Sequence, residues 1–531
     1  MTTTHKLLLT ITLTIAQVTT PLFEREGTGV SLFAQPVESL RRAIAITDAT
    51  MSTSFTGSDN NLRMYDTYNT ATHQGSGTAD VWPYTAALEA HCSVLEALEV
   101  LKEQAPDLYA DTHDRYVARL RVLYDNLAYY AGTYQLNSYA HVARWTIYGV
   151  HRAGSKGQAA VTGIENVYDD QMWLCRELVR AYRLTANDAY LKEATKLANY
   201  CIEGWDCCLD ADGNEYGGIS WGPGYNSKHS CSNGPLIQPL VWLADIYRSD
   251  DEAEDLIHYY IEPDGTRTSE KRRHSDQYML FARKIYAWQK EKLLDPSRGV
   301  YWDMCGAVKG EIQYVKSGRF NYRDHVDLNG PGGTAYTYNT GTMLAGAAEL
   351  YRVTGEEVYH ADLNDLCRNS LQRFSTRSRV NGHIYRTWPT DDQATSGFNT
   401  WFDDVLMRAF VDAIPYNDAN TSASDALTSF LEDLDYAWDN FRRDDLLPIH
   451  LIKGWDNGDV TKGFHQLAFA SEYAMLAIWQ SQQPESDAIT LTPHPSSLIR
   501  ATGALTLSGL PFQPPFHRGL YIIDGRKVLV R

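Results

Sequence analysis

A two-helix unit that recurs along the chain is the feature that most limits the possible folds. The stretch RAYRLTANDAYL (residues 180–191) resembles ELYRVTGEEVYH (residues 349–360). In each stretch one helical segment ends in Tyr-Arg, a turn with a threonine follows, and a second segment opens at Tyr190 or Tyr359. Repetition of such a unit, at intervals of about 60–100 residues, is typical of architectures built from stacked helix pairs.

Hydrophobic periodicity predicts about twelve helices, arranged in pairs. The first helix of each pair is expected near residues 84–103, 169–184, 234–248, 338–353, 402–414 and 464–481. The partners are expected near residues 38–54, 113–131, 188–203, 274–291, 356–373 and 423–443. The first set is rich in Ala, Gly and aromatic residues, whereas the second has polar faces. Inner apolar helices that alternate with outer amphipathic ones predict an all-α fold, an (α/α)6 barrel that forms a toroid of helical hairpins.

The ends of the chain differ from this helical region. Residues 7–16, LLLTITLTIA, follow Lys6 and resemble the apolar part of a secretory signal, but they are too few to span a membrane. We therefore expect a leader over residues 1–34 and a catalytic domain over 35–483. Residues 484–531 are rich in Pro, Ser and Thr and close on GLYIIDGRKVLVR, which predicts a linker and a β-hairpin around Asp524-Gly525. This tail resembles the terminal hairpin of exported Bacteroidota proteins.

Charge and composition limit the partners. The net charge of −18, from 66 acidic and 48 basic residues, argues against a nucleic-acid surface and is compatible with a neutral sugar. No segment is long and apolar enough to predict a membrane-spanning helix. We expect an exported monomer, located in the periplasm, at the cell surface or outside the cell.

No metal or cofactor site is predicted. The eight cysteines have neither CxxC pairs nor the Cys/His spacing of a zinc site, so buried free thiols are expected, although export would allow a disulfide. The segment DADGNEYGG (residues 210–218) resembles a calcium loop, but Cys208 and Ile219 fall at the first and twelfth positions, where acids are needed. It is interpreted as a turn.

Two adjacent aspartates, Asp169 and Asp170, are the candidate catalytic groups. They lie in the stretch NVYDDQMW (residues 166–173), and the apolar spacing over residues 172–182 places them in the first turn of a helix. Neighbouring helical side chains point about 100° apart, so the two carboxyls can flank a ligand, as the pair of a retaining glycosidase does at about 5–5.5 Å. An equally ordinary role for such a pair is to complement the helix dipole.

Five side chains are candidates for substrate binding. Two glycine-rich loops, GGISWGPGYNSKHSCSNG (residues 217–234) and NGPGGTAYTYN (residues 329–339), each precede an inner helix. Such loops carry binding residues at the rim of a helical ring. We expect Trp221, Tyr338, Trp388 and Trp82 to stack on sugar rings and Asn339 to contact hydroxyls, although each Trp could instead belong to the core.

A second aspartate pair, Asp403-Asp404 in TWFDDVLMRAF, has the same form as the first and also opens an inner helix. We interpret Asp403 and Asp404 as ligands of sugar hydroxyls at the rim, with helix capping as an equal alternative.

The segments NVYDDQMWLCRELVRAYRLTANDAYLKEA, GGISWGPGYNSKHSCSNG and YTYNTGTMLAGAAELYRVTGEEVY together resemble glycoside hydrolase family 76, the α-1,6-mannanases, over roughly residues 40–480. The resemblance implies a retaining, endo-acting and metal-independent hydrolase of α-mannan. It assigns Asp169 as the nucleophile and Asp170 as the acid/base. It leaves glycan transfer open, because the family is also similar to fungal enzymes thought to transfer glycans.

Other functional classes fit the residues less well. A terpene cyclase would need DDxxD for magnesium, but Trp173 occupies the fifth position. Sugar epimerases of a similar helical ring rely on paired histidines, which the starts of the inner helices here lack. A non-catalytic mannan-binding protein remains the main alternative, and an activity assay distinguishes it.

Overall fold

The computed structural model describes residues 36–248, 255–388, 399–418, 422–455 and 458–483, and three short strands at 505–506, 519–523 and 526–530. The predicted leader (1–34), most of the predicted linker and the turn at Asp524-Gly525 lie outside the described residues. The described residues form twelve α-helices, each at one of the positions that the hydrophobic periodicity predicts. The predominantly helical fold is therefore confirmed.

The helices alternate between two sets along the chain. The first set is α2 (Val81–Leu101), α4 (Tyr168–Thr185), α6 (Gly234–Arg248), α8 (Thr337–Thr354), α10 (Asn399–Ala413) and α12 (Gly463–Ser481). The second set is α1 (Pro36–Thr53), α3 (Pro106–Asn126), α5 (Asp188–Ile202), α7 (His274–Leu293), α9 (Glu357–Phe374) and α11 (Ser422–Phe441). Most residues of the first set are buried, whereas the second set buries one face.

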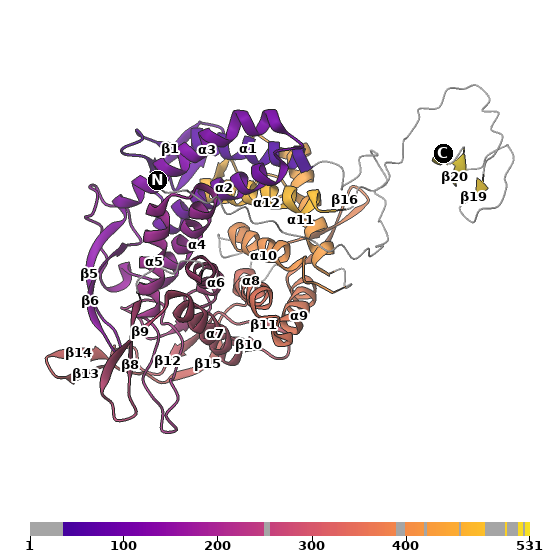
Figure 1. Cartoon of the computed structure of the whole chain (residues 1–531). Helices are drawn as coiled ribbons and strands as arrows, with labels where there is room; N and C mark the ends of the chain where they lie inside the picture. Colours follow the sequence, from indigo (N-terminus) through magenta and orange to yellow (C-terminus); the bar gives the residue numbers. More distant parts are fainter. Residues whose placement is uncertain are drawn as a thin grey trace, which may run out of the picture. The chain divides into compact units, whose positions relative to one another are not determined.

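The first set packs side by side in sequence order. Contacts run from α2 to α4, α6, α8, α10 and α12, and α12 contacts α2 again. Each helix of the second set packs against one or two helices of the first, as α5 does against α4 and α6. Figure 1 shows the first set around the middle of the helical region and the second set outside it. We call these the inner and outer helices.

Small residues allow the inner helices to approach closely. A Cβ atom added at Gly341 of α8 would lie 2.8 Å from the Cα atom of Leu406 in α10. At Gly346, it would lie 3.0 Å from the Ile237 side chain of α6. Larger residues would push the helices apart, because helix separation depends on the side chains at the contact. The abundance of Ala and Gly in the inner helices thus follows from packing on several sides.

The repeated sequence unit forms the same turn at both places. The inner helices α4 and α8 end at Ala186 and Gly355, both in the left-handed conformation, with φ of 52° and 66°. The amide of each donates to the carbonyl of the tyrosine four residues earlier, which satisfies a helix-terminal acceptor. The hydroxyls of Thr185 and Thr354 then accept from the amide two residues later. This shared turn reverses the chain from inner to outer helix.

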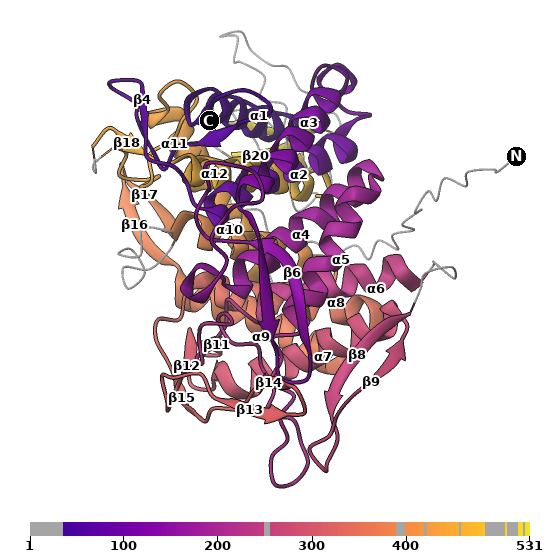
Figure 2. The ribbon, with the colours of Figure 1, turned by 90° about the vertical axis from the view of Figure 1, so that its left-hand side faces the viewer.

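Short antiparallel strands occur in the connections, which the sequence predicts only as loops. The hairpins are β1 (Phe55–Thr56) with β2 (Arg63–Met64), β5 (Ala131–Asn137) with β6 (Val142–Tyr148), β8 (Leu256–Ile261) with β9 (Arg267–Arg272), β10 (Leu294–Asp295) with β11 (Val300–Tyr301), β13 (Tyr314–Ser317) with β14 (Phe320–Arg323), and β16 (Thr376–Val380) with β17 (His383–Thr387). Figure 2 shows the long β5–β6 hairpin, whose strand β6 contacts α4.

Two three-stranded sheets join segments that are distant in the sequence. One has the order β18-β3-β4, from β18 (Val460–Thr461), β3 (Thr67–Asn69) and β4 (Gln74–Ser76). The other has the order β15-β12-β7, from β15 (Leu328–Gly332), β12 (Met304–Ala307) and β7 (Lys228–His229). The second sheet connects the two glycine-rich loops that precede α6 and α8. Near the C-terminus, β19 (Leu505–Thr506), β20 (Gly519–Ile523) and β21 (Arg526–Val530) pair antiparallel in the order β19-β20-β21.

Charged groups are paired inside the helical region. Arg180 of α4 donates to Glu177 at 2.7 Å and to Glu96 of α2 at 2.7 Å, and it is almost fully buried. Such pairs fix the packing of neighbouring helices, because leaving one of these charges without its partner would be costly. All eight cysteines are buried, and none forms a disulfide in the described part of the chain. Among the described helices, none is both long enough and apolar enough to cross a membrane.

Candidate active site

The backbone before α4 is held in place from two sides. The Tyr168 amide, at the first residue of the helix, donates to the carbonyl of Trp221 at 2.8 Å. The buried Asn166 donates its side-chain amide to Val161 and accepts from the hydroxyl of Tyr200 at 2.9 Å. Asp169 and Asp170 follow as the second and third residues of α4. The structure places the pair in the first turn of a helix, which is the position that the sequence predicts.

Asp169 is surrounded by hydrogen-bond donors. The indole nitrogen of Trp221 donates to its Oδ2 at 3.2 Å, and the Asp170 amide donates to its Oδ1 at 3.0 Å. The Cys231 thiol is a third donor. Burial raises the pKa of Asp169 to about 6, and these donors oppose that rise because they favour the ionised form.

Asp170 lies in a different environment. Its side chain is 7% exposed. Burial raises the pKa of Asp170 well above its usual range, and the negative charges of Asp169 and Asp80 raise it further. Of the two groups, Asp169 therefore loses its proton first. These shifts favour a negative charge on Asp169 and a bound proton on Asp170.

A third carboxyl group, that of Asp303, lies close enough to Asp169 to be affected by its charge. It lies between β11 and β12, where its carbonyl accepts from the Ser230 amide at 2.7 Å. Burial raises the pKa of Asp303 to about 6, a hydrogen bond from Tyr338 lowers it, and the charge of Asp169 raises it. Tyr338 therefore lies in the group around Asp169, and its stacking on a sugar ring stays a prediction.

Sequence reasoning missed Asp303, Cys231 and Asp80. Asp80 stands directly before α2, so the expectation that the starts of the inner helices share one end of the ring could have found it. Cys231 lies in the glycine-rich loop of residues 217–234, but a single thiol in a loop does not by itself indicate a catalytic site. Asp303 follows strand β11, and no periodicity or motif marks it.

The loop that carries Trp221 is clamped by Arg323 of β14, which is 5% exposed. The Arg323 guanidinium donates to the carbonyls of Pro223, at 3.2 Å, and Tyr225, and to the side-chain oxygen of Asn226 at 3.2 Å. A planar fork with several donors suits a curved run of backbone acceptors. The turn that presents Trp221 to Asp169 thus depends on a residue about one hundred positions later in the chain.

A buried ion pair supports the base of the same loop. The ammonium group of Lys228 lies 2.8 Å from the Asp206 carboxylate and also donates to the Gly217 carbonyl. The imidazole of His325 lies 2.7 Å from the same carboxylate. Lys228 and Asp206 are both nearly inaccessible, so the loop is anchored on both sides of Trp221.

Trp82 belongs to an aromatic cluster that reaches Tyr338. Its ring stacks on Phe402 at 5.9 Å between centroids and meets Trp401 and Phe464 edge-on. Phe402 in turn lies 4.3 Å from the Tyr338 ring. Trp82 is partly exposed, so one side of this cluster is open to solvent.

Two other predicted binding residues take part in packing. The Asn339 side chain is fully buried, and its amide lies 3.5 Å from the Thr334 carbonyl. The Trp388 indole donates to Ser429 at 2.9 Å and stacks on Phe430 at 4.6 Å, and both of these residues belong to the outer helix α11. These contacts place Trp388 against the outer helix α11.

The second aspartate pair lies in the interior. Asp403 is 5% exposed and accepts a hydrogen bond from Thr337 at 3.0 Å. Asp404 is fully buried and lies 3.6 Å from Arg408 of the same helix. Burial raises the pKa of both carboxyls well above the usual range. The structure thus separates the two pairs that look alike in the sequence.

Comparisons with known proteins agree with this fold. The model of glycosyl hydrolase family 76 matches residues 102–256 and 271–433. The family 76 glycoside hydrolase (mannosidase) Bt3792 from Bacteroides thetaiotaomicron VPI-5482 is similar in structure, with a TM-score of 0.59 and 19% identity over 84% of this chain and 99% of that one. The GH76A α-1,6-mannanase from Salegentibacter sp. HEL1_6 has a TM-score of 0.53 and 18% identity over 83% and 99%.

At these identities the two structures establish a shared fold. No curated protein matches the chain. The family match, however, spans more than half of the 531 residues, and so the chain belongs to glycosyl hydrolase family 76.

Proposed function

We propose that this glycoside hydrolase cleaves α-1,6-mannosidic bonds within mannan chains and retains the configuration of the anomeric carbon. The observation that carries the proposal is the unequal environment of two adjacent carboxyls. Asp169 accepts hydrogen bonds from the Trp221 indole and the Asp170 amide, whereas burial and the charge of Asp169 raise the pKa of Asp170 and favour its protonated form. Pairs of carboxyls with separated pKa values are how glycosidases divide the two roles.

The roles follow from the charges. Asp169, as the ionised group, attacks the anomeric carbon and forms a glycosyl-enzyme ester while the glycosidic bond breaks. Asp170 gives its proton to the departing sugar oxygen and then, as a carboxylate, takes a proton from the water that hydrolyses the ester. Hydrolysis of the ester releases the sugar that was bound to Asp169. It leaves Asp169 as a carboxylate and Asp170 protonated, as before the reaction.

The substrate class rests on two kinds of support. An inactive variant of the Salegentibacter α-1,6-mannanase, with two consecutive aspartates replaced, was solved in complex with α-1,6-mannotriose. In this chain, the Trp221 indole contacts Asp169, the charge of Asp169 acts on Tyr338, and Trp82 shares the ring of Phe402 with Tyr338. Aromatic rings of this kind can stack on pyranose rings. We assign the contacts with sugar to these three residues, and packing roles to Asn339, Trp388, Asp403 and Asp404.

The closed circuit of inner helices supports the interpretation of residues 35–483 as one (α/α)6 barrel with the site at the N-terminal ends of its inner helices. A site open at the end of a ring can accept the middle of a polymer, which favours internal cleavage. We further propose that the protein is exported as a monomer after removal of residues 1–34 and acts without a metal or cofactor, with residues 484–531 as a linker and tail.

Digestion of debranched yeast mannan in the presence of EDTA tests the proposal. The expected products are α-1,6-manno-oligosaccharides of several lengths, and proton NMR of the first product should show the α-anomer. An Asp169→Asn variant should release none. If the wild-type protein releases no oligosaccharide, or loses its activity on chelation, the proposal fails. Products longer than the substrate would show that glycan transfer replaces hydrolysis.

A further inference from the structure

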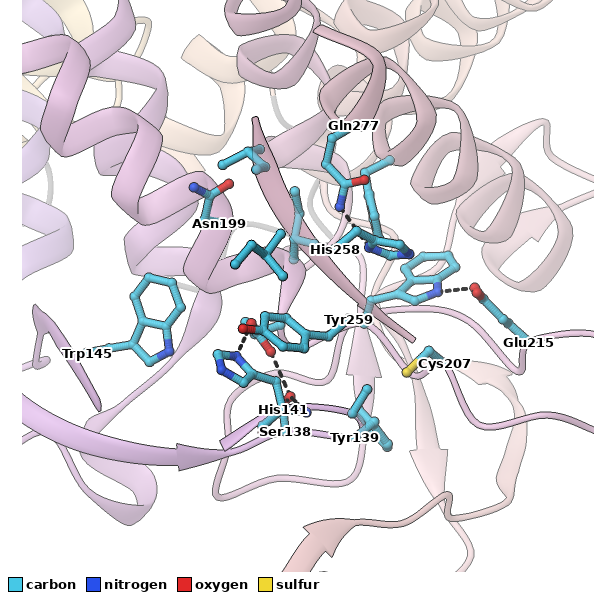
Figure 3. A pocket seen from close by; sticks show the side chains of 17 residues that line it. Ser138, Tyr139, His141, Trp145, Asn199, Cys207, Glu215, His258, Tyr259 and Gln277 are labelled. Carbon is cyan, nitrogen blue, oxygen red and sulfur yellow. Dashed lines mark hydrogen bonds and ion pairs between the residues drawn. The ribbon is translucent and has the colours of Figure 1, made fainter. Parts of the chain in front are cut away.

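A cavity lined by none of the residues around Asp169 lies against the outer helices α5 and α7. It has a volume of about 140 Å³ and lies between the β5–β6 hairpin, the end of α5, strand β8 and the start of α7 (Figure 3). Ligand pockets for drug-sized molecules have roughly 300–1,000 Å³, so this cavity suits a single small ring.

Aromatic side chains form much of its wall. Trp145 of β6, Trp205 after α5 and Tyr259 of β8 all line it. The Tyr259 ring is held parallel to the His141 ring, with centroids 3.7 Å apart, so its orientation is fixed before any ligand binds. Flat, rigid aromatic rings that also carry a polar group are suited to the apolar face of a sugar.

The charged groups of the wall are already paired. The Glu203 carboxylate accepts from Ser138 and from His141, each at 2.7 Å (Figure 3). The Glu215 carboxylate accepts from the indole of Trp205 at 2.6 Å and lies 2.7 Å from the Lys284 ammonium. Each carboxylate therefore already has hydrogen-bond partners within the wall, and the negative charge of the wall disfavours an anionic ligand.

The remaining polar groups of the wall are neutral. Burial lowers the pKa of His258 to about 4, so this imidazole, which contacts Gln277 at 3.0 Å, is uncharged at neutral pH. The buried indole nitrogen of Trp145 has no hydrogen-bond partner within the described residues. A buried donor without an acceptor is unfavourable, and buried donors in proteins normally have partners, so a ligand acceptor within reach of this nitrogen would be stabilised.

We propose that this cavity is a second saccharide-binding site, which takes one neutral pyranose unit of the polysaccharide that the enzyme hydrolyses. A pyranose combines an apolar face for Tyr259 with hydroxyl groups that can accept from Trp145 and donate to the wall carboxylates. The identity of that sugar as a mannose unit rests on the proposed function. The site would hold a long chain at a place apart from Asp169 and would leave short substrates unaffected.

Affinity electrophoresis of a catalytically inactive variant tests the proposal. The Asp169→Asn, Asp170→Asn double variant is run in gels that contain yeast mannan, a β-glucan or a galactan. Tyr259→Ala or Trp145→Phe in that background should weaken binding in the mannan gel by roughly threefold to tenfold, the scale of one aromatic contact. Tyr314→Ala, at an exposed tyrosine of β13 outside the cavity, is the matched control and should bind as the parent does.

The single variants with intact aspartates separate this site from the catalytic one. Tyr259→Ala should hydrolyse an aryl α-mannoside as the wild type does, with an unchanged melting temperature, but should show a higher KM for mannan. If both cavity variants bind every polysaccharide like the Tyr314→Ala control, the inference is overturned. If tetramethylammonium, and no sugar, changes tryptophan fluorescence in a way that Trp145→Phe removes, the cavity is a cation site and the inference is also overturned.

The proposed function can fail independently. If the protein does not hydrolyse mannan but its cavity variants lose binding in the glucan or galactan gel, the saccharide site stands and the substrate assignment falls. If mannan is hydrolysed and none of the three gels distinguishes the cavity variants, the saccharide site falls alone.

Discussion

At the scale of single residues, hydrogen-bond donors distinguish two carboxyls that are neighbours in the sequence. The Trp221 indole and the Cys231 thiol both act on Asp169. Asp170 instead is shifted by burial and by the charge of Asp169. Because donors stabilise a carboxylate and burial destabilises it, the first group is prepared to attack and the second to donate a proton.

Replacement of the two aspartates should therefore have different consequences. Asp169→Ala should abolish turnover of every substrate, because no glycosyl-enzyme can form. Asp170→Ala should lose activity on mannan but retain the first step with an aryl mannoside, whose leaving group needs little protonation. Azide should partly rescue Asp170→Ala and give a mannosyl azide of retained configuration. Rescue of Asp169→Ala alone, with an inverted azide, would reverse the assigned roles.

The indole of Trp221 should set the acidic limit of activity. Trp221→Phe keeps the ring but removes the donor to Asp169, so the pKa of Asp169 should rise from about 6. The acidic limb of the kcat profile should then move to higher pH, by up to about one unit. Trp388→Phe is the control, because that indole donates to Ser429. An acidic limb that stays in place in Trp221→Phe would contradict the role of this hydrogen bond.

At the scale of elements, the β13–β14 hairpin positions the site without touching Asp169. Its Arg323 holds the turn at Pro223 and Tyr225, and this turn fixes the direction of Trp221. The sheet β15-β12-β7 ties the loop before α6 to the loop before α8. The strands in the connections therefore position the loop side chains, such as Trp221, at the N-terminal ends of the inner helices.

Arg323→Lys should loosen this loop while keeping the charge, because an ammonium group cannot match the fork of a guanidinium. We expect kcat/KM on mannan to fall by roughly tenfold to one-hundredfold, the scale of a misplaced catalytic contact. The acidic limb should shift in the same direction as in Trp221→Phe. Arg319→Lys, at an exposed position of the same hairpin, serves as the control. If Arg323→Lys lowers only the melting temperature and leaves kcat/KM and the pH profile unchanged, the positioning role is wrong.

At the scale of the whole molecule, the interior of the helical region contains several buried acids. Asp403 of α10, Asp433 of α11 and Glu472 of α12 are all buried, and burial raises the pKa of each well above its usual range. The charge of Asp403 also raises the pKa of the other two. Burial therefore favours the protonated form of each of these acids.

This arrangement predicts how stability depends on pH. A carboxyl with a raised pKa in the folded state contributes its full stability below the unfolded pKa of about 4 and loses it as pH rises through the folded value. Asp403→Asn resembles the protonated group, so its free energy of unfolding should equal that of the wild type near pH 4 and exceed it at pH 7–8. Each unit of the pKa difference is worth about 1.4 kcal/mol.

Urea unfolding at several pH values measures this difference. Activity provides a second readout, since Asp403→Asn should leave KM for mannan unchanged if the side chain belongs to the interior. A raised KM together with an unchanged pH dependence of stability would restore Asp403 as a ligand of the substrate.

Local sequence determined the helices and the place of the catalytic candidates within them. The periodicity of apolar side chains is a property of a few consecutive turns, so it gave all twelve helices and put Asp169 and Asp170 in the first turn of α4. The repeated turn at Ala186 and Gly355 is equally local, because its hydrogen bonds join residues within one or two turns. Nothing beyond neighbouring residues was needed for these features.

Tertiary structure decided which groups act together. The aspartate pairs at Asp169 and Asp403 follow the same local rule, yet one meets Trp221 and Asp303 while the other is enclosed between helices. These differences arise from contacts between residues 52 or more positions apart, such as Trp221 with Asp169. The pKa of a group depends on the segments that fold against it. Local sequence patterns do not specify which distant segments these are.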